Sequence, residues 1–241
     1  MRRLLPEPAE LDDAGLLEAY RCPPGRRLRM DFIASPDGAI TVGGVSGGLG
    51  SPGDRRVFRV LRALADVVLV GHGTAAAEGY RPVLPDSEVG RLRRSTGVSA
   101  TAPIAVVSRR ASLDPAGRLV ADAVSPTIVV TCAVADPARR AVLADAGAEV
   151  LVCGDDDVDL PAALDALADR GLEQVTCEGG PQLLRSALAA GVVDELDLSV
   201  SPALVGGEAR LLDTALPHPA RLTLRQVLEE DGMLFTRYDV G

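Results

Sequence analysis

The sequence contains no tryptophan, and aromatic residues make up only 2% of its 241 positions. Hydrophobic residues nevertheless account for 47% of the chain, which is enough for a full core. Such a core must be built from valine, leucine, isoleucine and alanine, the residues that fill parallel sheets covered by helices. The scarcity of aromatic residues therefore favours an α/β protein.

Closely spaced cysteines are also missing. The four cysteines, at positions 22, 132, 153 and 177, form no C-x-x-C pair. We therefore expect neither a disulfide nor a zinc or other metal site, and a reduced protein of the cytoplasm. The basic start of the chain lacks the apolar run of a signal peptide. No segment approaches the roughly 20 apolar residues of a membrane span, so we expect no membrane partner.

Positive charge is in short supply, because the formal net charge is −9 at pH 7. Nucleic acids and anionic membranes are negatively charged, so this balance disfavours both as general partners. An anionic small molecule would need a local basic site on such a protein.

The sequence does contain a regular alternation of β-prone and helical segments. Expected strands cover residues 29–34, 65–70, 104–107, 127–131, 149–152, 175–177 and 195–200. Helices are expected over residues 12–20, from Ser51 or Pro52 onward, and over 75–78, 137–146 and 160–170, with another from Pro181. Two last β-prone runs, 221–227 and 233–238, predict an antiparallel hairpin. This order predicts a mainly parallel, doubly wound sheet with an antiparallel end. We expect one domain over residues 28–241, with residues 1–27 laid on it as an arm.

Residues 174–184 carry the most informative local pattern. A β-prone run ends in Glu178, Gly179 and Gly180, and Pro181 then opens a helical pattern. Glycines permit a close approach of the backbone, and a helix start offers free N–H groups and the positive end of a dipole. This turn suits a phosphate group. The alternative is an ordinary tight turn between a strand and a helix.

Further candidate ligand-binding segments follow two other expected strands. Gly71-His72-Gly73-Thr74 is a second glycine turn, and Ser108-Arg109 follows the strand 104–107. In open α/β sheets, ligands bind at the carboxyl ends of strands, where these segments should converge. Two glycine turns and a Ser-Arg pair suit a dinucleotide with an extra phosphate. The G-x-G-x-x-G fingerprint and the Walker A motif are absent, which disfavours an ordinary Rossmann dehydrogenase.

Five motifs together resemble one family. They are Ser35-Pro36-Asp37-Gly38; Gly71-His72-Gly73-Thr74 with Glu78; Glu178-Gly179-Gly180-Pro181 with Leu183; Asp194-Glu195-Leu196; and Pro202-Ala203-Leu204-Val205-Gly206-Gly207. In this order they resemble the reductase domain of riboflavin-biosynthesis deaminase/reductase proteins, over about residues 28–240. The resemblance implies a three-layer α/β/α, dihydrofolate reductase-like fold.

The resemblance also implies an activity. The family's reductases use NADPH and act on a phosphorylated pyrimidine, here most directly 5-amino-6-(5-phosphoribosylamino)uracil, with hydride reaching the sugar C1′ through a ring-opened imine. Asp37 would be a proton donor or an orienting acid, and Ser46, Arg62 and Glu178 would contact the substrate. By position, the cofactor would be held by Gly71, Gly73, Thr74, Glu78, Ser108, Arg109, Gly179, Gly180, Pro181, Gln182 and Leu183. The family habit implies a homodimer.

The sequence departs from the family pattern at three places. No zinc deaminase motif is present. Asp31 stands where family members often carry lysine, and the expected substrate arginine after the second glycine turn has only Arg81 as a nearby candidate. Two alternatives therefore stay open, namely a related reductase of another heterocycle such as dihydrofolate, and a non-catalytic NADPH-binding protein.

Overall fold

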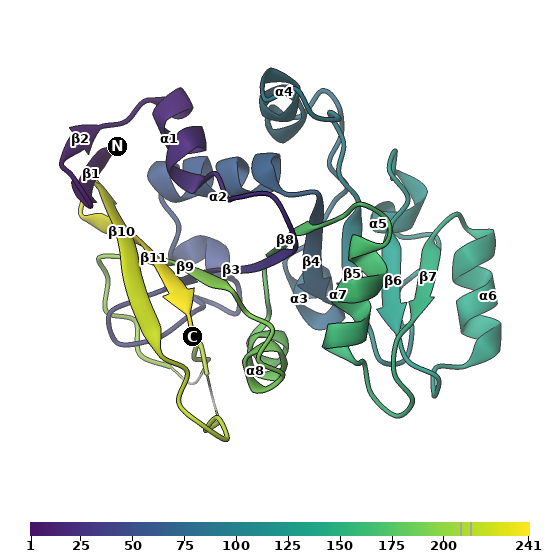
Figure 1. The fold of residues 1–241 in the computed structure, drawn as a ribbon. Helices are drawn as coiled ribbons and strands as arrows, with labels where there is room; N and C mark the ends of the chain where they lie inside the picture. Colours follow the sequence, from purple (N-terminus) through teal and green to yellow (C-terminus); the bar gives the residue numbers. More distant parts are fainter. Residues whose placement is uncertain (208, 213) are drawn as a thin grey trace.

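A computed structural model describes residues 1–207, 209–212 and 214–241 of the chain. One sheet of eleven strands crosses the whole molecule, in the order β2-β1-β10-β11-β9-β3-β8-β4-β5-β6-β7 (Figure 1). Its strands are β1 (Arg2–Leu5), β2 (Ala9–Glu10), β3 (Arg27–Ala34), β4 (Val67–Gly71), β5 (Ile104–Val107), β6 (Ile128–Thr131), β7 (Glu149–Val152), β8 (Gln174–Cys177), β9 (Glu195–Val200), β10 (Leu222–Glu230) and β11 (Met233–Val240).

The strands in the centre of the sheet are parallel. The strands at the end of the sheet formed by the N- and C-terminal segments of the chain are antiparallel. β3 pairs in parallel with both β8 and β9, and β4 joins β8 to β5. β11 pairs antiparallel with β9 and with β10. The predicted mainly parallel sheet with an antiparallel C-terminal hairpin is thus confirmed.

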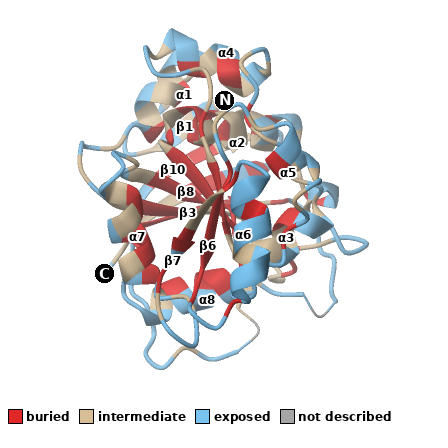
Figure 2. Cartoon of the chain, turned by 90° about the vertical axis from the view of Figure 1, so that its right-hand side faces the viewer, coloured by how far each residue is buried: buried red, intermediate tan, exposed pale blue. Residues whose placement is uncertain are grey.

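Helices cover both faces of the sheet. They are α1 (Asp13–Tyr20), α2 (Pro52–Leu64), α3 (His72–Ala77), α4 (Glu88–Ser95), α5 (Arg118–Ala121), α6 (Pro137–Asp145), α7 (Leu160–Ala168) and α8 (Pro181–Ala189). Alternate residues of β4 pack against helices on opposite faces of the sheet. Val67 and Leu69 pack with α7 and α8, whereas Val68 and Val70 pack with residues of α3, α5 and α6. The parallel strands β4, β5 and β6 are therefore buried on both faces, as their continuous apolar runs require (Figure 2).

Residues 1–27, expected as an arm laid on the domain, extend the sheet. β1 pairs antiparallel with β10, and β2 pairs with β1. Leu16 and Tyr20 of α1 pack in the same cluster as Val57 and Leu61 of α2. Figure 1 shows this purple segment beside the yellow C-terminal hairpin. The first residues therefore belong to the folded unit. No helix among the described residues has both the length and the apolar character needed to cross a membrane.

Candidate active site

The two glycine turns predicted from the sequence lie side by side. β4 and β8 are neighbouring parallel strands, so their carboxyl ends meet at the same edge of the sheet. The backbone N–H of Gly71 donates to the carbonyl of Gly179 over 2.6 Å and joins the turns directly. Gly179 has φ +88°, a conformation that side chains rarely adopt, and a Cβ there would lie 2.8 Å from the Phe32 ring. Glycine is required at this position to bring the two turns together.

A large cleft, of about 860 Å³, opens beside these turns. Its lining includes four arginines, which we call the arginine cleft: Arg109, Arg110, Arg185 and Arg210. Nine of the eleven residues predicted to hold the cofactor also line it, namely Gly71, Gly73, Thr74, Ser108, Arg109, Gly180, Pro181, Gln182 and Leu183. No side chain caps the first turn of α8, which begins at Pro181, so backbone N–H groups there are available to a ligand. These features fit the phosphates of a nicotinamide dinucleotide.

Ser108 and Arg109 occupy the cleft in different ways. Ser108 is buried, and its hydroxyl accepts a hydrogen bond from the N–H of Ser112 over 2.9 Å. Arg109 is half exposed, and its Nε donates to the carbonyl of Asp156 over 2.6 Å, with a carboxylate oxygen of Asp157 at 4.0 Å. The acidic run 155–157 thus borders the arginine predicted to bind a phosphate.

A second, smaller cavity, of about 260 Å³, adjoins the cleft. Four carboxyl groups line it, and we call it the acidic cavity: those of Asp31, Asp54, Glu78 and Glu178. Among the described residues that line it there is no arginine, lysine or histidine. Four residues line both spaces and form a common wall, namely Gly73, Thr74, Gly180 and Pro181. A ligand in the cleft and a ligand in the cavity would therefore meet at this wall.

Glu178 is held rigidly on one side of the acidic cavity. Its two carboxylate oxygens accept hydrogen bonds from Nε and Nη2 of Arg62, over 2.6 and 2.7 Å. The hydroxyl of Tyr80 donates to the same carboxylate over 2.6 Å. The Arg62 guanidinium also lies over the rings of Phe58 and Tyr80, 4.4 and 5.2 Å from their centres. Burial disfavours the guanidinium charge, but the Glu178 carboxylate outweighs it, so the pKa of Arg62 lies above its ordinary value.

These contacts change the role expected of Arg62. The sequence predicts a substrate contact at this position, yet Arg62 is not among the residues that line the acidic cavity. Its hydrogen-bonding capacity is largely taken by Glu178, which does line the cavity. We therefore assign Arg62 to the positioning of Glu178.

Ser46 and Glu78 were predicted as separate contacts, one for substrate and one for cofactor. The structure joins them, because the backbone N–H of Ser46 donates to Oε1 of Glu78 over 2.8 Å. Both residues line the acidic cavity, and Glu78 does not line the arginine cleft. Glu78 thus ties the glycine-rich segment around Ser46 to the end of α3.

Asp37, which the sequence predicts to be a proton donor or an orienting acid, is bound by groups of its own chain. It lines neither the cavity nor the cleft. Its carboxylate accepts hydrogen bonds from the Ser35 hydroxyl over 2.6 Å and from the N–H groups of Val205 and Gly206 over 3.2 and 2.7 Å. These bonds, that of Ser35 first, lower the pKa of Asp37 to about 2. The group is therefore ionised at neutral pH and anchors the segment that contains Val205 and Gly206.

We expect Asp37→Ala to release that segment. Because both amides would lose their acceptor, hydrogen exchange at Val205 and Gly206 should accelerate at least about tenfold, corresponding to about 1.4 kcal/mol per factor of ten. Exchange measured by NMR checks this. Asp155→Ala, which removes an exposed carboxylate elsewhere, is the matched control and should leave both amides unchanged. Unchanged protection in Asp37→Ala would contradict the anchoring role.

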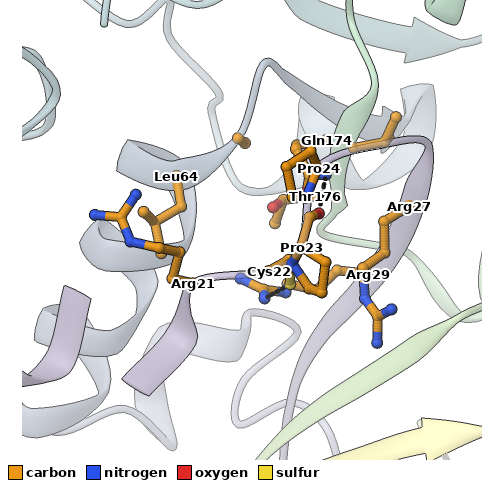
Figure 3. Close-up of a pocket in the computed structure, with 11 residues that line it drawn as sticks. Arg21, Cys22, Pro23, Pro24, Arg27, Arg29, Leu64, Gln174 and Thr176 are labelled. Carbon is orange, nitrogen blue, oxygen red and sulfur yellow. Dashed lines mark hydrogen bonds between the residues drawn. The ribbon is translucent and has the colours of Figure 1, made fainter. Parts of the chain in front are cut away.

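A third cavity, of about 160 Å³, lies at the opposite ends of the strands, where β3 and β8 begin. Figure 3 shows its lining, with Cys22 and Pro23 between Arg21 and Arg29. Most of its polar groups are already engaged, although Nε of Arg27 is buried without a hydrogen-bond partner among the described residues. Arg29 is paired with Glu195 over 2.6 Å, and the Gln174 amide donates to the carbonyls of Pro23 and Gly25. This cavity is therefore a gap between packed segments of the chain, and the candidate active site lies at the other edge of the sheet.

The comparisons with known proteins agree with the geometry. A model of the RibD C-terminal domain matches residues 26–232. The chain belongs to this family. Among the described residues, no group of three or more His, Cys, Asp or Glu side chains is placed to hold a metal ion.

Similar proteins of this family are named reductases. A protein of Methanothermobacter thermautotrophicus is 33% identical over 177 residues, which cover 73% of this chain and 78% of that one. A protein of Archaeoglobus fulgidus is 30% identical over 154 residues, or 64% and 69% of the two chains. Both are named 2,5-diamino-6-ribosylamino-4(3H)-pyrimidinone 5′-phosphate reductase. The crystal structure of a pyrimidine reductase-like protein from Corynebacterium diphtheriae matches with a TM-score of 0.78 and 30% identity, over 90% of this chain and 92% of that one. The predicted family and enzyme class are confirmed.

The sequence did not single out several residues of the site. Asp54, Phe58 and Tyr80 line the acidic cavity, and Arg110, Arg185 and Arg210 line the arginine cleft. Asp54 lies in the first turn of α2, where acidic residues are common for electrostatic reasons alone. Asp31 was noted only as a departure from the family pattern. Its exposure to the cavity is visible only in the folded chain.

Proposed function

We propose that this protein is an NADPH-dependent reductase of a 6-(5-phosphoribosylamino)pyrimidine in riboflavin biosynthesis. The observation that carries the proposal is the wall shared by the arginine cleft and the acidic cavity. The cleft suits a polyanionic dinucleotide, and the cavity suits a small ring that carries hydrogen-bond donors. NADPH bound in the cleft would supply the hydride. Gly180 and Thr74 would then separate the cofactor from the substrate.

The charges of the acidic cavity bear on which pyrimidine is reduced. Carboxyl oxygens accept hydrogen bonds even when the group holds a proton, so a cavity with four carboxyl groups favours amino substituents over ring carbonyls. The sequence predicts 5-amino-6-(5-phosphoribosylamino)uracil, whereas the named relatives act on the corresponding 2-amino pyrimidinone. A site rich in acceptors rejects a substrate that presents an acceptor in place of a donor. We propose that the 2-amino compound is the better substrate. The same acidic groups would disfavour the substrate phosphate beside them, and Ser46, which also lines the cavity, stays the predicted contact for it.

Oxidation of NADPH, followed at 340 nm with each compound in turn, tests this proposal. We expect kcat/KM to be at least about tenfold higher for the 2-amino pyrimidinone than for the uracil. Dihydrofolate is the third compound, because it also presents an amino-substituted ring edge. Faster turnover of dihydrofolate than of either pyrimidine would replace the proposed substrate. If the protein binds NADPH but reduces none of the three compounds, the alternative of a non-catalytic NADPH-binding protein would be supported instead.

We expect the protein to prefer NADPH over NADH by at least about tenfold in Kd. Ser108 and Arg109 offer a charge-assisted contact to a 2′-phosphate of roughly 1.5–3 kcal/mol. Arg109→Ala should reduce the preference, measured by fluorescence titration with both cofactors. The control is Arg94→Ala, because Arg94 is exposed on α4 and lies outside the cleft. Equal affinities of the wild type for NADH and NADPH would contradict this assignment.

We also propose a homodimer in the cytoplasm. The family habit supports the dimer, as does the outer half of β10, which leaves Leu222 and Leu224 exposed by 46% and 42%. In the described residues, β1 pairs with β10 only from Val227 to Glu229, so this part of the strand has a free edge. Leu224→Arg should shift the mass in sedimentation velocity from dimer to monomer. A monomeric wild type would contradict the proposal. The cytoplasmic location rests on the widely spaced cysteines alone.

A further inference from the structure

Asp31 and Asp54 are the two aspartates of the acidic cavity, and they differ because a hydrogen bond with Ser199 and the charge of Arg55 stabilise the ionised form of Asp54. Asp31 lies on β3 with its side chain lining the acidic cavity. Glu178 is bound by Arg62 and Tyr80, and Glu78 accepts the N–H of Ser46. Among the described residues, no group forms a hydrogen bond or an ion pair with the Asp31 side chain. Its carboxyl is therefore free to contact a ligand.

The groups around Asp31 are acidic or neutral apart from Arg29, and the neutral ones that face its charge are Tyr20, Tyr80 and Cys177. Asp197 is its register partner on the neighbouring strand β9, Glu178 follows β8, and Asp54 belongs to α2. Arg29, two residues earlier on β3, is the cation nearby, but it pairs with Glu195 and Asp197 over 2.6 and 3.1 Å. A negative charge on Asp31 would thus face three other carboxyls.

This environment stabilises the protonated form. Burial first, and then the charges of Glu178, Asp197 and Asp54, raise the pKa of Asp31 well above its ordinary value, and Arg29 lowers it only in part. An acid with a raised pKa keeps its proton at pH values where an ordinary aspartate has lost it. The contrast with Asp37, whose pKa is lowered to about 2, is direct.

We propose that Asp31 is the proton donor of the reduction. This inference rests on the proposed function, in which a C=N bond between C1′ and the pyrimidine amine is reduced. The reaction needs one hydride at carbon and one proton at nitrogen. The cofactor supplies the hydride; the Asp31 carboxyl supplies the proton, so an N–H bond forms as its O–H bond breaks. Asp31 is left as a carboxylate and takes a proton back from water. Reduction of the C=N bond of dihydrofolate would make the same demand.

The pH dependence follows from the sign of the pKa shift. The reaction needs the protonated carboxyl, so the hydride-transfer rate is highest below the pKa of Asp31. It falls about tenfold per pH unit above that pKa. This fall in rate is the descending limb of the pH–rate profile. The rate of single-turnover oxidation of NADPH by the 2-amino pyrimidinone, followed between about pH 5.5 and 9, measures it.

Asp31→Asn tests the assignment, because it keeps the size of the side chain and removes the acid. We expect the hydride-transfer rate at the low-pH end to fall at least about 100-fold, with the Kd of NADPH within about threefold of wild type. The descending limb should also disappear. The matched control is Asp37→Asn, which makes the same chemical substitution at the aspartate that lines neither the cavity nor the cleft and should keep both the rate and the limb. A rate within tenfold of wild type, or an unchanged limb, in Asp31→Asn would overturn the proposal.

A second measurement does not depend on turnover. In protein labelled with ¹³C at aspartate carboxyls, the resonance missing from Asp31→Asn should titrate well above about pH 4, the ordinary aspartate value. Titration near that value would overturn the inference even for an active enzyme. A wild type that reduces neither pyrimidine nor dihydrofolate, but whose Asp31 resonance titrates high, would overturn the proposed function instead. The two failures are thereby distinguished.

Discussion

Gly180→Val is expected to abolish NADPH binding while the protein stays folded. A Cβ at Gly180 would lie 2.5 Å from Oγ1 of Thr74, on the wall that the cleft and the cavity share. A branched side chain would push Thr74 aside and fill the space where a phosphate approaches the start of α8. We expect the Kd of NADPH to rise at least about 100-fold, the equivalent of about 2.7 kcal/mol. Fluorescence titration measures the affinity, and circular dichroism measures the fold.

Gly73→Ala provides the comparison on the same wall. A Cβ at Gly73 would meet no described atom within 4 Å, so the protein itself accommodates it. Any loss of affinity in this variant must come from contact with the ligand, and we expect less than the loss in Gly180→Val. Wild-type affinity in Gly180→Val would show that the turn 178–181 does not approach the cofactor.

The second large effect is expected from Arg62→Ala. The substitution leaves Glu178, which is only 8% exposed, with the Tyr80 hydroxyl as its remaining partner. Removing one member of a buried ion pair costs roughly 3–5 kcal/mol, because the other charge stays buried. We expect the free energy of unfolding in urea to fall by about 3 kcal/mol and KM to rise at least about tenfold. Kd for NADPH should change little, because the cleft keeps its lining.

Two further variants separate the causes. Arg59→Ala removes an arginine of the same helix that pairs with the exposed Glu88, and it should change stability by less than about 0.5 kcal/mol. The double variant Arg62→Ala with Glu178→Gln removes the orphaned charge and should regain much of the stability lost in Arg62→Ala. A normal stability of Arg62→Ala, with the loss confined to NADPH affinity, would place Arg62 in the cofactor site instead.

The sequence was informative about the fold wherever local pattern and burial agree. β5 and β7 have the predicted bounds, and α2 begins at Pro52 after its Ser51 cap, because apolar runs and caps are local signals. No helix was predicted for the segments that form the short helices α4 and α5. β1 and β2 were missed because their pairing with β10 joins opposite ends of the chain. A four-residue strand with a far partner leaves little trace in its own residues.

The part of the candidate site that consists of backbone, the two glycine turns, could be predicted from the sequence. Both glycine turns follow strands of a parallel sheet, so their placement at the carboxyl edge could be inferred from the sequence. That β4 and β8 are direct neighbours is seen only in the structure. The charges could not be paired in the same way. Arg62 and Glu178 are separated by 116 residues, and nothing in either segment reveals that one neutralises the other. Asp31 and Asp37 differ by six positions, yet burial and neighbouring carboxyls raise one pKa while hydrogen bonds lower the other.

The wall shared by the cleft and the cavity has a thermodynamic consequence. Gly73, Thr74, Gly180 and Pro181 line both spaces, so a ligand that shifts them on one side reshapes the other. The two binding equilibria are then coupled. If bound cofactor changes the affinity for substrate by some factor, bound substrate must change the affinity for cofactor by the same factor.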